Sequence, residues 1–173
     1  MNRRKSIKQI AVVAGGLITL PQWMVSCGIS DSTAHHSSFS QSEQELLASI
    51  TDTIIPPGNS IGALSVGVDK YLHKLIDDCF EKDIQDNVKA QLKKLDLLAQ
   101  SSNKKAFAGC TQQQRLDLLM KLSASSNKAE KDFFDLVKTE TIRGFNTSQK
   151  VMQDYLDYKV APGHYFGCVE VKT

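Results

Sequence analysis

The stretch DIQDNVKAQLKKLDLLAQ, residues 83–100, shows the clearest helical period in the chain. Apolar side chains return every three or four residues, at Ile84, Val88, Leu92, Leu95 and Ala99. This spacing places them on one face of an α-helix and leaves most of the charged residues on the other faces. The stretch therefore predicts a helix with one buried face, which we expect to end at residues 101–103, Ser-Ser-Asn.

Two further helices are expected before this one. The sequence Ser40-Gln-Ser-Glu43 has the form of a capping box, which predicts that the first helix begins at Ser40. Residues 56–58, Pro-Pro-Gly, end it, because proline cannot continue the hydrogen-bond ladder. A second helix is expected over residues 68–80. The apolar positions of the two helices are Leu46, Leu47, Ile50 and Ile54, and then Val68, Leu72, Leu75, Ile76 and Cys79.

Three shorter predictions follow residue 103. Thr111-Gln-Gln-Gln114 is a second capping box and opens a short helix. A longer helix is expected over residues 128–143, with Gly144 as its C-terminal glycine. Thr147 is expected to cap a last helix that reaches about Tyr155. The apolar positions are Leu116, Leu119 and Met120, and then Phe133, Phe134, Leu136, Val137 and Ile142.

The chain as a whole predicts an all-α domain. No stretch alternates convincingly at the period of two that is typical of strands. Residues 156–173 are aromatic and lack a helical period, so we expect an extended, irregular C-terminal arm. The prediction is a small domain of five to six helices over residues 40–173.

The first 27 residues have the layout of an export signal. A basic start precedes an apolar run over residues 10–20 and a small-residue site. The pair Arg3 and Arg4 resembles a twin-arginine signal, although Ser6 stands where that pattern has a large apolar residue. Met24-Val-Ser-Cys27 resembles a bacterial lipobox, in which the cysteine is acylated. We therefore expect an exported protein, lipid-anchored at Cys27 on the periplasmic side of a bacterial membrane, with a plain secretory signal or an uncleaved anchor as the alternatives.

Length and charge narrow the class of protein further. Residues 28–39 are small and polar and predict a flexible tether. The signal carries four of the 21 basic residues and no acidic one, so residues 28–173 hold 17 basic against 19 acidic residues. No basic surface is left to indicate a nucleic-acid partner. These 146 residues suffice for one domain with its own core.

The cysteines leave two possibilities open. If Cys27 is lipidated, Cys79, Cys110 and Cys168 form an odd set, which favours a free thiol or a bridge to another chain. Cys79 lies on the apolar face of its helix and is expected to be buried. Cys110 directly precedes a helix cap and is expected to be half-exposed. A disulfide between Cys79 and Cys110 is one possible pairing.

The sequence offers no set of catalytic or metal-binding residues. His73 and Asp77 share a helix face, but two groups do not fill a zinc shell. The sequence contains no Gly-x-Gly-x-x-Gly loop, no Walker loop and no Cys-x-x-Cys-His haem site. We therefore expect no catalytic, cofactor-binding or metal-binding residue in this chain. The residues favour a binding or scaffold domain over an enzyme.

Three segments together resemble the gluconate 2-dehydrogenase subunit 3 family, the small subunit of membrane-bound flavin-dependent sugar and sugar-acid dehydrogenases. They span about residues 43–170. The segments are residues 50–56 followed by 66–68, residues 133–138 followed by 144–148, and residues 162–169.

The resemblance implies a non-catalytic partner of a large FAD-bearing subunit of the glucose-methanol-choline oxidoreductase type. In such complexes the large subunit often lacks its own signal, and the small subunit carries it through the twin-arginine route and supports its folding. Electrons then pass to a haem c subunit or to the respiratory chain. The FAD is expected in the partner and not in this chain.

The resemblance also directs attention to the arm. Many relatives have an acidic residue before the final glycine–cysteine pair, where this chain has Phe166. Our hypothesis is that Tyr165, Gly167 and Cys168 lie at the interface with the catalytic subunit, with Cys168 either bridged to it or buried there. The alternatives are an arm that packs on its own helices and, for the protein as a whole, a stand-alone lipid-anchored binding or scaffold protein of the cell envelope.

Overall fold

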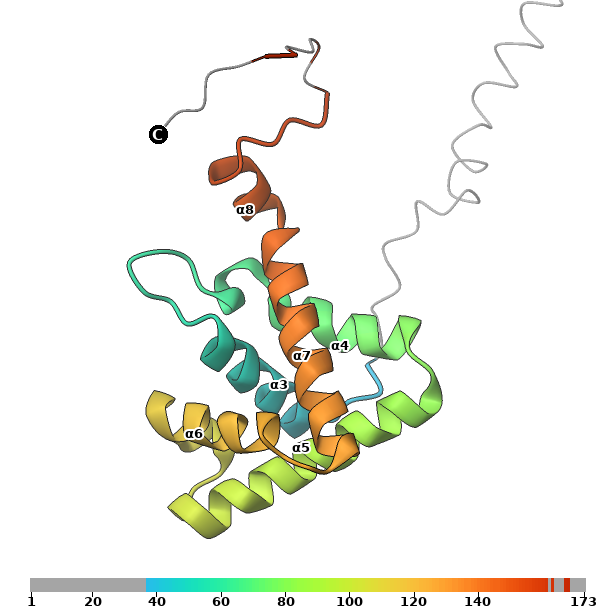
Figure 1. Cartoon of the computed structure of the whole chain (residues 1–173), viewed down its shortest axis with the longest axis vertical. Coiled ribbons are helices and arrows are strands. Elements are labelled where there is room, and N and C mark those ends of the chain that lie inside the picture. The colour runs from blue at the N-terminus through green and yellow to red at the C-terminus, as the bar shows by residue number, and fades with distance from the viewer. Residues whose placement is uncertain (1–36, 162, 164–166, 169–173) are drawn as a thin grey trace, which may run out of the picture. The chain divides into compact units, whose positions relative to one another are not determined.

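The computed structural model describes residues 37–161, 163, 167 and 168 (Figure 1). This part of the chain is all-helical, with six α-helices and no strand, which confirms the predicted fold class. The α-helices are α3 (Gln41–Ile54), α4 (Val68–Cys79), α5 (Lys82–Asn103), α6 (Gln112–Ser123), α7 (Lys128–Asn146) and α8 (Gln149–Asp154). Two 3₁₀ turns complete the set, η1 (Ala63–Val66) and η2 (Phe107–Gly109).

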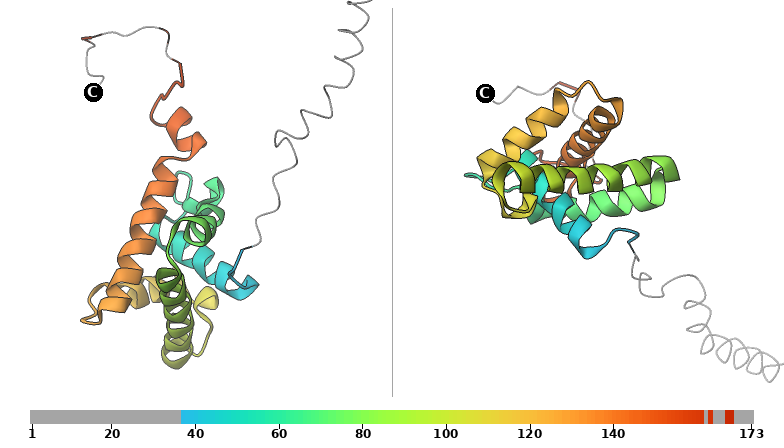
Figure 2. Two further views of the ribbon diagram at one scale, coloured as in Figure 1. Left: turned by 90° about the vertical axis from the view of Figure 1, so that its right-hand side faces the viewer. Right: turned by 90° about the horizontal axis from the view of Figure 1, so that it is seen from below.

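The helices α3 and α7 are both central to the domain, because each contacts the other and also α4, α5 and α6. Figure 2 shows α7 crossing the other helices, with α8 continuing beyond one of its ends. The core between them is aliphatic with two fully buried phenylalanines. Burial of each such side chain contributes about 1.5–3 kcal/mol to folding. The largest fully buried apolar side chains are Leu47, Ile50, Val68, Leu72, Ile76, Val88, Leu92, Leu95, Phe107, Phe133 and Val137.

The helix α5 confirms its predicted face and corrects its predicted end. Val88, Leu92, Leu95 and Ala99 are all completely buried. The residues Ser-Ser-Asn at 101–103 continue the helix, since their low propensity costs only a few tenths of a kcal/mol each. The helix ends instead at Asn103, and its C-cap Lys104 has a left-handed backbone (φ 56°) that closes the last turn.

Both predicted capping boxes are present. The Glu43 amide donates to Ser40 Oγ (3.4 Å), and the Ser40 amide donates to Glu43 Oε2 (2.9 Å). Thr111 and Gln114 make the same reciprocal pair at the start of α6. The cap of α8 is Ser148 and not Thr147.

Three predicted features of the later helices are wrong. The helix α7 runs through Gly144 to Asn146, so Gly144 does not terminate it. In α6 the buried leucines are Leu118, Leu119 and Leu122, whereas Leu116 and Met120 are 41% and 57% exposed. The apolar residues of α6 are spread over more than one of its faces, and the contacts of α6 with α3, α5 and α7 decide which of them are buried. Ile142 of α7 is likewise exposed.

Phe39 belongs to the core, although the sequence places it in the tether. Its side chain is only 3% exposed and packs in the main apolar cluster. Asp77 of α4 accepts hydrogen bonds from Ser37 Oγ (2.8 Å), from the Ser38 amide (3.0 Å) and from Ser38 Oγ. The residues directly before α3 are therefore anchored to α4. None of the helices in the described part of the chain is long and apolar enough to cross a membrane.

Candidate interaction site

A loop shaped by close backbone contacts follows α3. The amide of Ala63 donates to the carbonyl of Ile55 (2.9 Å), which closes the loop over residues 55–63. Gly62 lies so close to Pro57 that a Cβ at this position would stand 2.6 Å from the Pro57 nitrogen. Only glycine permits this approach. Leu64, at the start of η1, is left 43% exposed.

The C-terminal arm begins beside this loop. Ser60 Oγ donates to the hydroxyl of Tyr155 over 3.3 Å. The amide of Tyr158 donates back to the Met152 carbonyl (2.9 Å), and Asp157 adopts a left-handed φ of 48° at the bend. The four large apolar or aromatic residues of this segment are exposed: Tyr155, Leu156, Tyr158 and Val160.

The loop and the start of the arm therefore form one end of the domain, with α8 between them (Figure 1). A shallow cavity of about 400 Å³ lies between η1 and α8, lined by Ser65 and Val66 of η1 and by polar side chains at and after the cap of α8. We call Leu64, Tyr155, Leu156, Tyr158 and Val160 the apolar end. Neighbouring exposed apolar residues are typical of surfaces that bind a partner.

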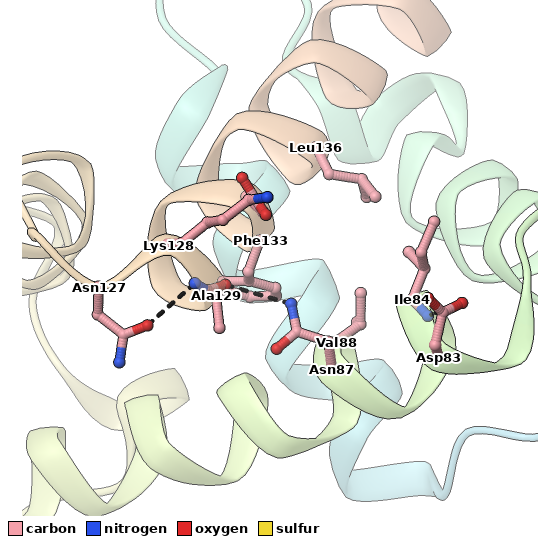
Figure 3. Close-up of a pocket in the computed structure, with 10 residues that line it drawn as sticks. Asp83, Ile84, Asn87, Val88, Asn127, Lys128, Ala129, Phe133 and Leu136 are labelled. Atoms are coloured by element: carbon pink, nitrogen blue, oxygen red, sulfur yellow. Dashed lines mark hydrogen bonds between the residues drawn. The ribbon is translucent and has the colours of Figure 1, made fainter.

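A second feature is a groove between α5 and α7 of about 690 Å³. Val88 and Phe133 form part of its lining, and Ile84 and Leu136 are partly exposed in it (Figure 3). The polar lining residues are Asp83, Asn87, Asn127, Lys128 and Asp132.

A buried carboxylate links α4 to α7. Glu140 is 6% exposed and accepts a long hydrogen bond from the hydroxyl of Tyr71 (3.4 Å). Arg143, one turn further along α7, forms an ion pair with it (Nη1 to Oε1, 2.9 Å). Burial raises the pKa of the Tyr71 phenol, and the negative charge of Glu140 raises it further.

Some of the predicted site residues lie within the part of the chain that the structure describes, and others lie outside it. Arg3, Arg4, Cys27 and Tyr165 lie outside the described residues. Gly167 and Cys168 lie within them and are exposed, and Cys168 carries a free thiol. Their proposed role at an interface stays a prediction.

The burial expected for Cys79 and for Cys110 is wrong in both cases, and their possible disulfide is absent. Cys79 and Cys110 are free thiols, so the pairing considered for them is absent. Cys79 is exposed because it is the last residue of α4, and Phe80 packs against the core in its place. Cys110 is buried, and its thiol donates to the carbonyl of Ala106 over 3.5 Å.

The described residues contain no group of three or more histidine, cysteine, aspartate or glutamate side chains arranged to hold a metal ion. Asp77, considered with His73 as a pair, binds Ser37 and Ser38. Sequence reasoning missed both this contact and the burial of Phe39. An apolar residue directly before an N-cap is the signal that could have revealed Phe39, because that position commonly packs against the first turns of a helix.

Comparison with known proteins identifies the family. The family model described as gluconate 2-dehydrogenase subunit 3 matches residues 41–163. No curated protein and no solved structure matches the chain. The matched range contains the first two of the three segments on which the resemblance rests and ends inside the third. Because the match spans well over half of the sequence, the chain belongs to the gluconate 2-dehydrogenase subunit 3 family.

Proposed function

We propose that this chain is a non-catalytic small subunit of a membrane-associated flavin-dependent dehydrogenase complex. In this proposal it binds a FAD-bearing catalytic subunit of the glucose-methanol-choline type, stabilises it and escorts it through twin-arginine export. A haem c subunit or the respiratory chain then receives the electrons. The family match over residues 41–163 is the observation that carries the proposal.

The apolar end supports the binding part of the proposal. Tyr155, Leu156, Tyr158 and Val160 are between 50% and 85% exposed, and Leu64 adds to them. Aromatic side chains that are exposed in the free subunit gain burial when a partner covers them. We therefore assign the apolar end, together with Tyr165, Gly167 and Cys168, to the interface with the catalytic subunit.

The predicted export signal supports the escort part. Twin-arginine export accepts folded cargo, and a subunit that binds FAD in the cytoplasm would have to fold before export. One signal on the small subunit would then serve both chains. Cys27, once acylated, would hold the finished complex at the membrane.

The escort is tested by expressing both chains in the native host with Arg3→Lys and Arg4→Lys together. We expect both this chain and the flavoprotein to remain in the cytoplasm. Lys5→Arg serves as the matched control, since it also exchanges one basic residue for another in the same segment. Export of both chains by the double variant would refute the escort.

Co-purification separates this proposal from a stand-alone binding protein. Pull-down of the full chain should bring a second chain that carries flavin absorbance. A colourless monomer would contradict the proposed complex. A bridge through Cys168 is tested by non-reducing gel electrophoresis of that complex, in which a small-subunit band of normal mobility would exclude it.

A further inference from the structure

We propose that the groove between α5 and α7 is a second contact for the catalytic subunit, separate from the apolar end. It would receive an apolar side chain that is followed closely by an arginine or lysine. This inference rests on the proposed function and adds the position and chemistry of one contact.

The groove suits an apolar side chain because apolar side chains form part of its walls. Val88 and Phe133 are 0% and 1% exposed, so the apolar surface that a partner could contact belongs to Ile84 and Leu136. Ile84 and Leu136 are partly exposed and lie on the two sides of the opening (Figure 3). A cavity of about 690 Å³ can hold a few side chains, which matches one short segment of a partner.

The polar groups at the end of the groove near the start of α7 are already engaged with each other. Asn87 Nδ2 donates to the Ala129 carbonyl (3.2 Å), and the Ala129 amide donates to Asn127 Oδ1 (2.9 Å). Gln91 Nε2 donates to Asn87 Oδ1 (3.1 Å). An ion pair between Lys94 and Glu130 joins the two helices close by. These bonds hold α5 and α7 at a fixed separation, so the groove exists before a partner binds.

The charge of the groove determines which partner fits. Asp83 projects from α5 and Asp132 from α7, and neither forms an ion pair with any other described residue. Asp83 accepts one hydrogen bond, from the Ile84 amide. Lys128 supplies the one positive charge of the lining. Two carboxylates on opposite helices favour a cationic side chain and disfavour an anion such as phosphate.

The test compares charge reversals in the co-expressed full-length complex. We expect Asp83→Lys with Asp132→Lys to weaken binding of the flavoprotein at least tenfold at low salt. The difference should shrink as salt rises, because exposed charges are screened. The matched control is Glu45→Lys with Asp117→Lys. These two exposed carboxylates lie on α3 and α6 and each accepts one hydrogen bond from a glutamine one turn earlier.

The outcomes separate the groove from the proposed function. Weak binding by the groove variant, with normal binding by the control and an unchanged melting temperature for both, supports the groove. Equal binding by wild type and the groove variant overturns the groove and leaves the proposed function intact. Failure of the wild type to bind overturns both. Light scattering could instead show that the wild-type chain is a dimer and the groove variant a monomer. This result would assign the groove to a second copy of this chain and overturn the proposal.

Discussion

The ring of Tyr71 in α4 lies directly against Gly144 in α7. A Cβ placed on Gly144 would stand 2.5 Å from Tyr71 Cδ1 and 2.8 Å from Cε1, well inside van der Waals contact. The Tyr71 hydroxyl reaches Glu140 on the previous turn of α7. This contact sets how closely α4 and α7 approach, just before α7 leads into α8 and the arm.

Gly144→Ala should therefore destabilise the domain. Alanine in a helix interior normally stabilises by about 0.5–1 kcal/mol relative to glycine. Here the added methyl group must displace the Tyr71 ring, and overpacking of this kind costs about 1–3 kcal/mol. We expect a lower free energy of unfolding in urea titrations, with an unchanged slope.

The control for this prediction is the same change in a Tyr71→Ala background. Without the ring, Gly144→Ala should be neutral or stabilising. The double variant should therefore lose less free energy of unfolding than the two single variants lose in sum. A destabilisation of equal size in both backgrounds would show that Tyr71 is not the cause.

Tyr71 also predicts a pH dependence. Burial first, and then the charge of Glu140, raise the pKa of the phenol above its ordinary value of about 10. The folded protein therefore holds this proton more tightly than the unfolded chain does. The contribution of this raised pKa to the free energy of unfolding is complete below about pH 10, and it is lost as the pH rises through the pKa of the folded state.

The measurement is the free energy of unfolding between pH 8 and pH 11 for wild type and Tyr71→Phe. Lysines titrate in the same range in both proteins, so the difference between the two curves isolates Tyr71. We expect wild type to lose stability faster than the variant above about pH 10. Parallel curves would contradict a raised pKa.

Phe39 should be as important to stability as residues inside the helices. Phe39→Ala should cost about 3–5 kcal/mol, as is usual for a buried phenylalanine. The ammonium of Lys89 lies 5.1 Å from the centre of the ring and donates to the Ser38 carbonyl (2.9 Å). Phe39→Leu is the control, since it keeps an apolar side chain and should cost much less. A small effect of Phe39→Ala on the melting temperature would place residue 39 with the tether after all.

Local patterns were sufficient for much of the fold. The start of α3 and α6 depends on a side chain and a backbone group three residues apart, so the capping boxes at Ser40 and Thr111 could be found from the sequence. The buried face of α5 follows from one uninterrupted period. The family could also be inferred, because it is identified by three short segments that occur in the same order along this chain.

The features that sequence reasoning missed depend on distant contacts. Gly144 resembles a helix terminator unless Tyr71, 73 positions earlier, is known to lie against it. Phe39 packs in the core and under Lys89 of α5, and Asp77 of α4, which binds Ser37 and Ser38, is about 40 positions away. The groove arises from residues of α5 and α7 that no single period connects. These are tertiary contacts, and a local pattern does not encode them.

The cysteines give a chemical test of the fold. Cys79 and Cys168 are exposed and Cys110 is buried, with its sulfur also accepting a hydrogen bond from Asn103 Nδ2 (3.7 Å). In a Cys27→Ser chain we expect two thiols to react rapidly with an aromatic disulfide reagent. The third should react only as fast as the domain opens, since modification needs access to the sulfur.

Single substitutions assign each phase of that reaction. Cys79→Ser and Cys168→Ser should each remove one rapid equivalent, whereas Cys110→Ser should remove the slow one and leave the rapid phase unchanged. Adding urea should accelerate the slow phase alone, because Cys110 is held between α5 and α6 near Ala106. If only one thiol reacts until a reductant is added, and Cys168→Ser removes that thiol, Cys79 and Cys110 are bridged and the described arrangement around η2 is wrong. If all three react at one rate, Cys110 is not part of the core.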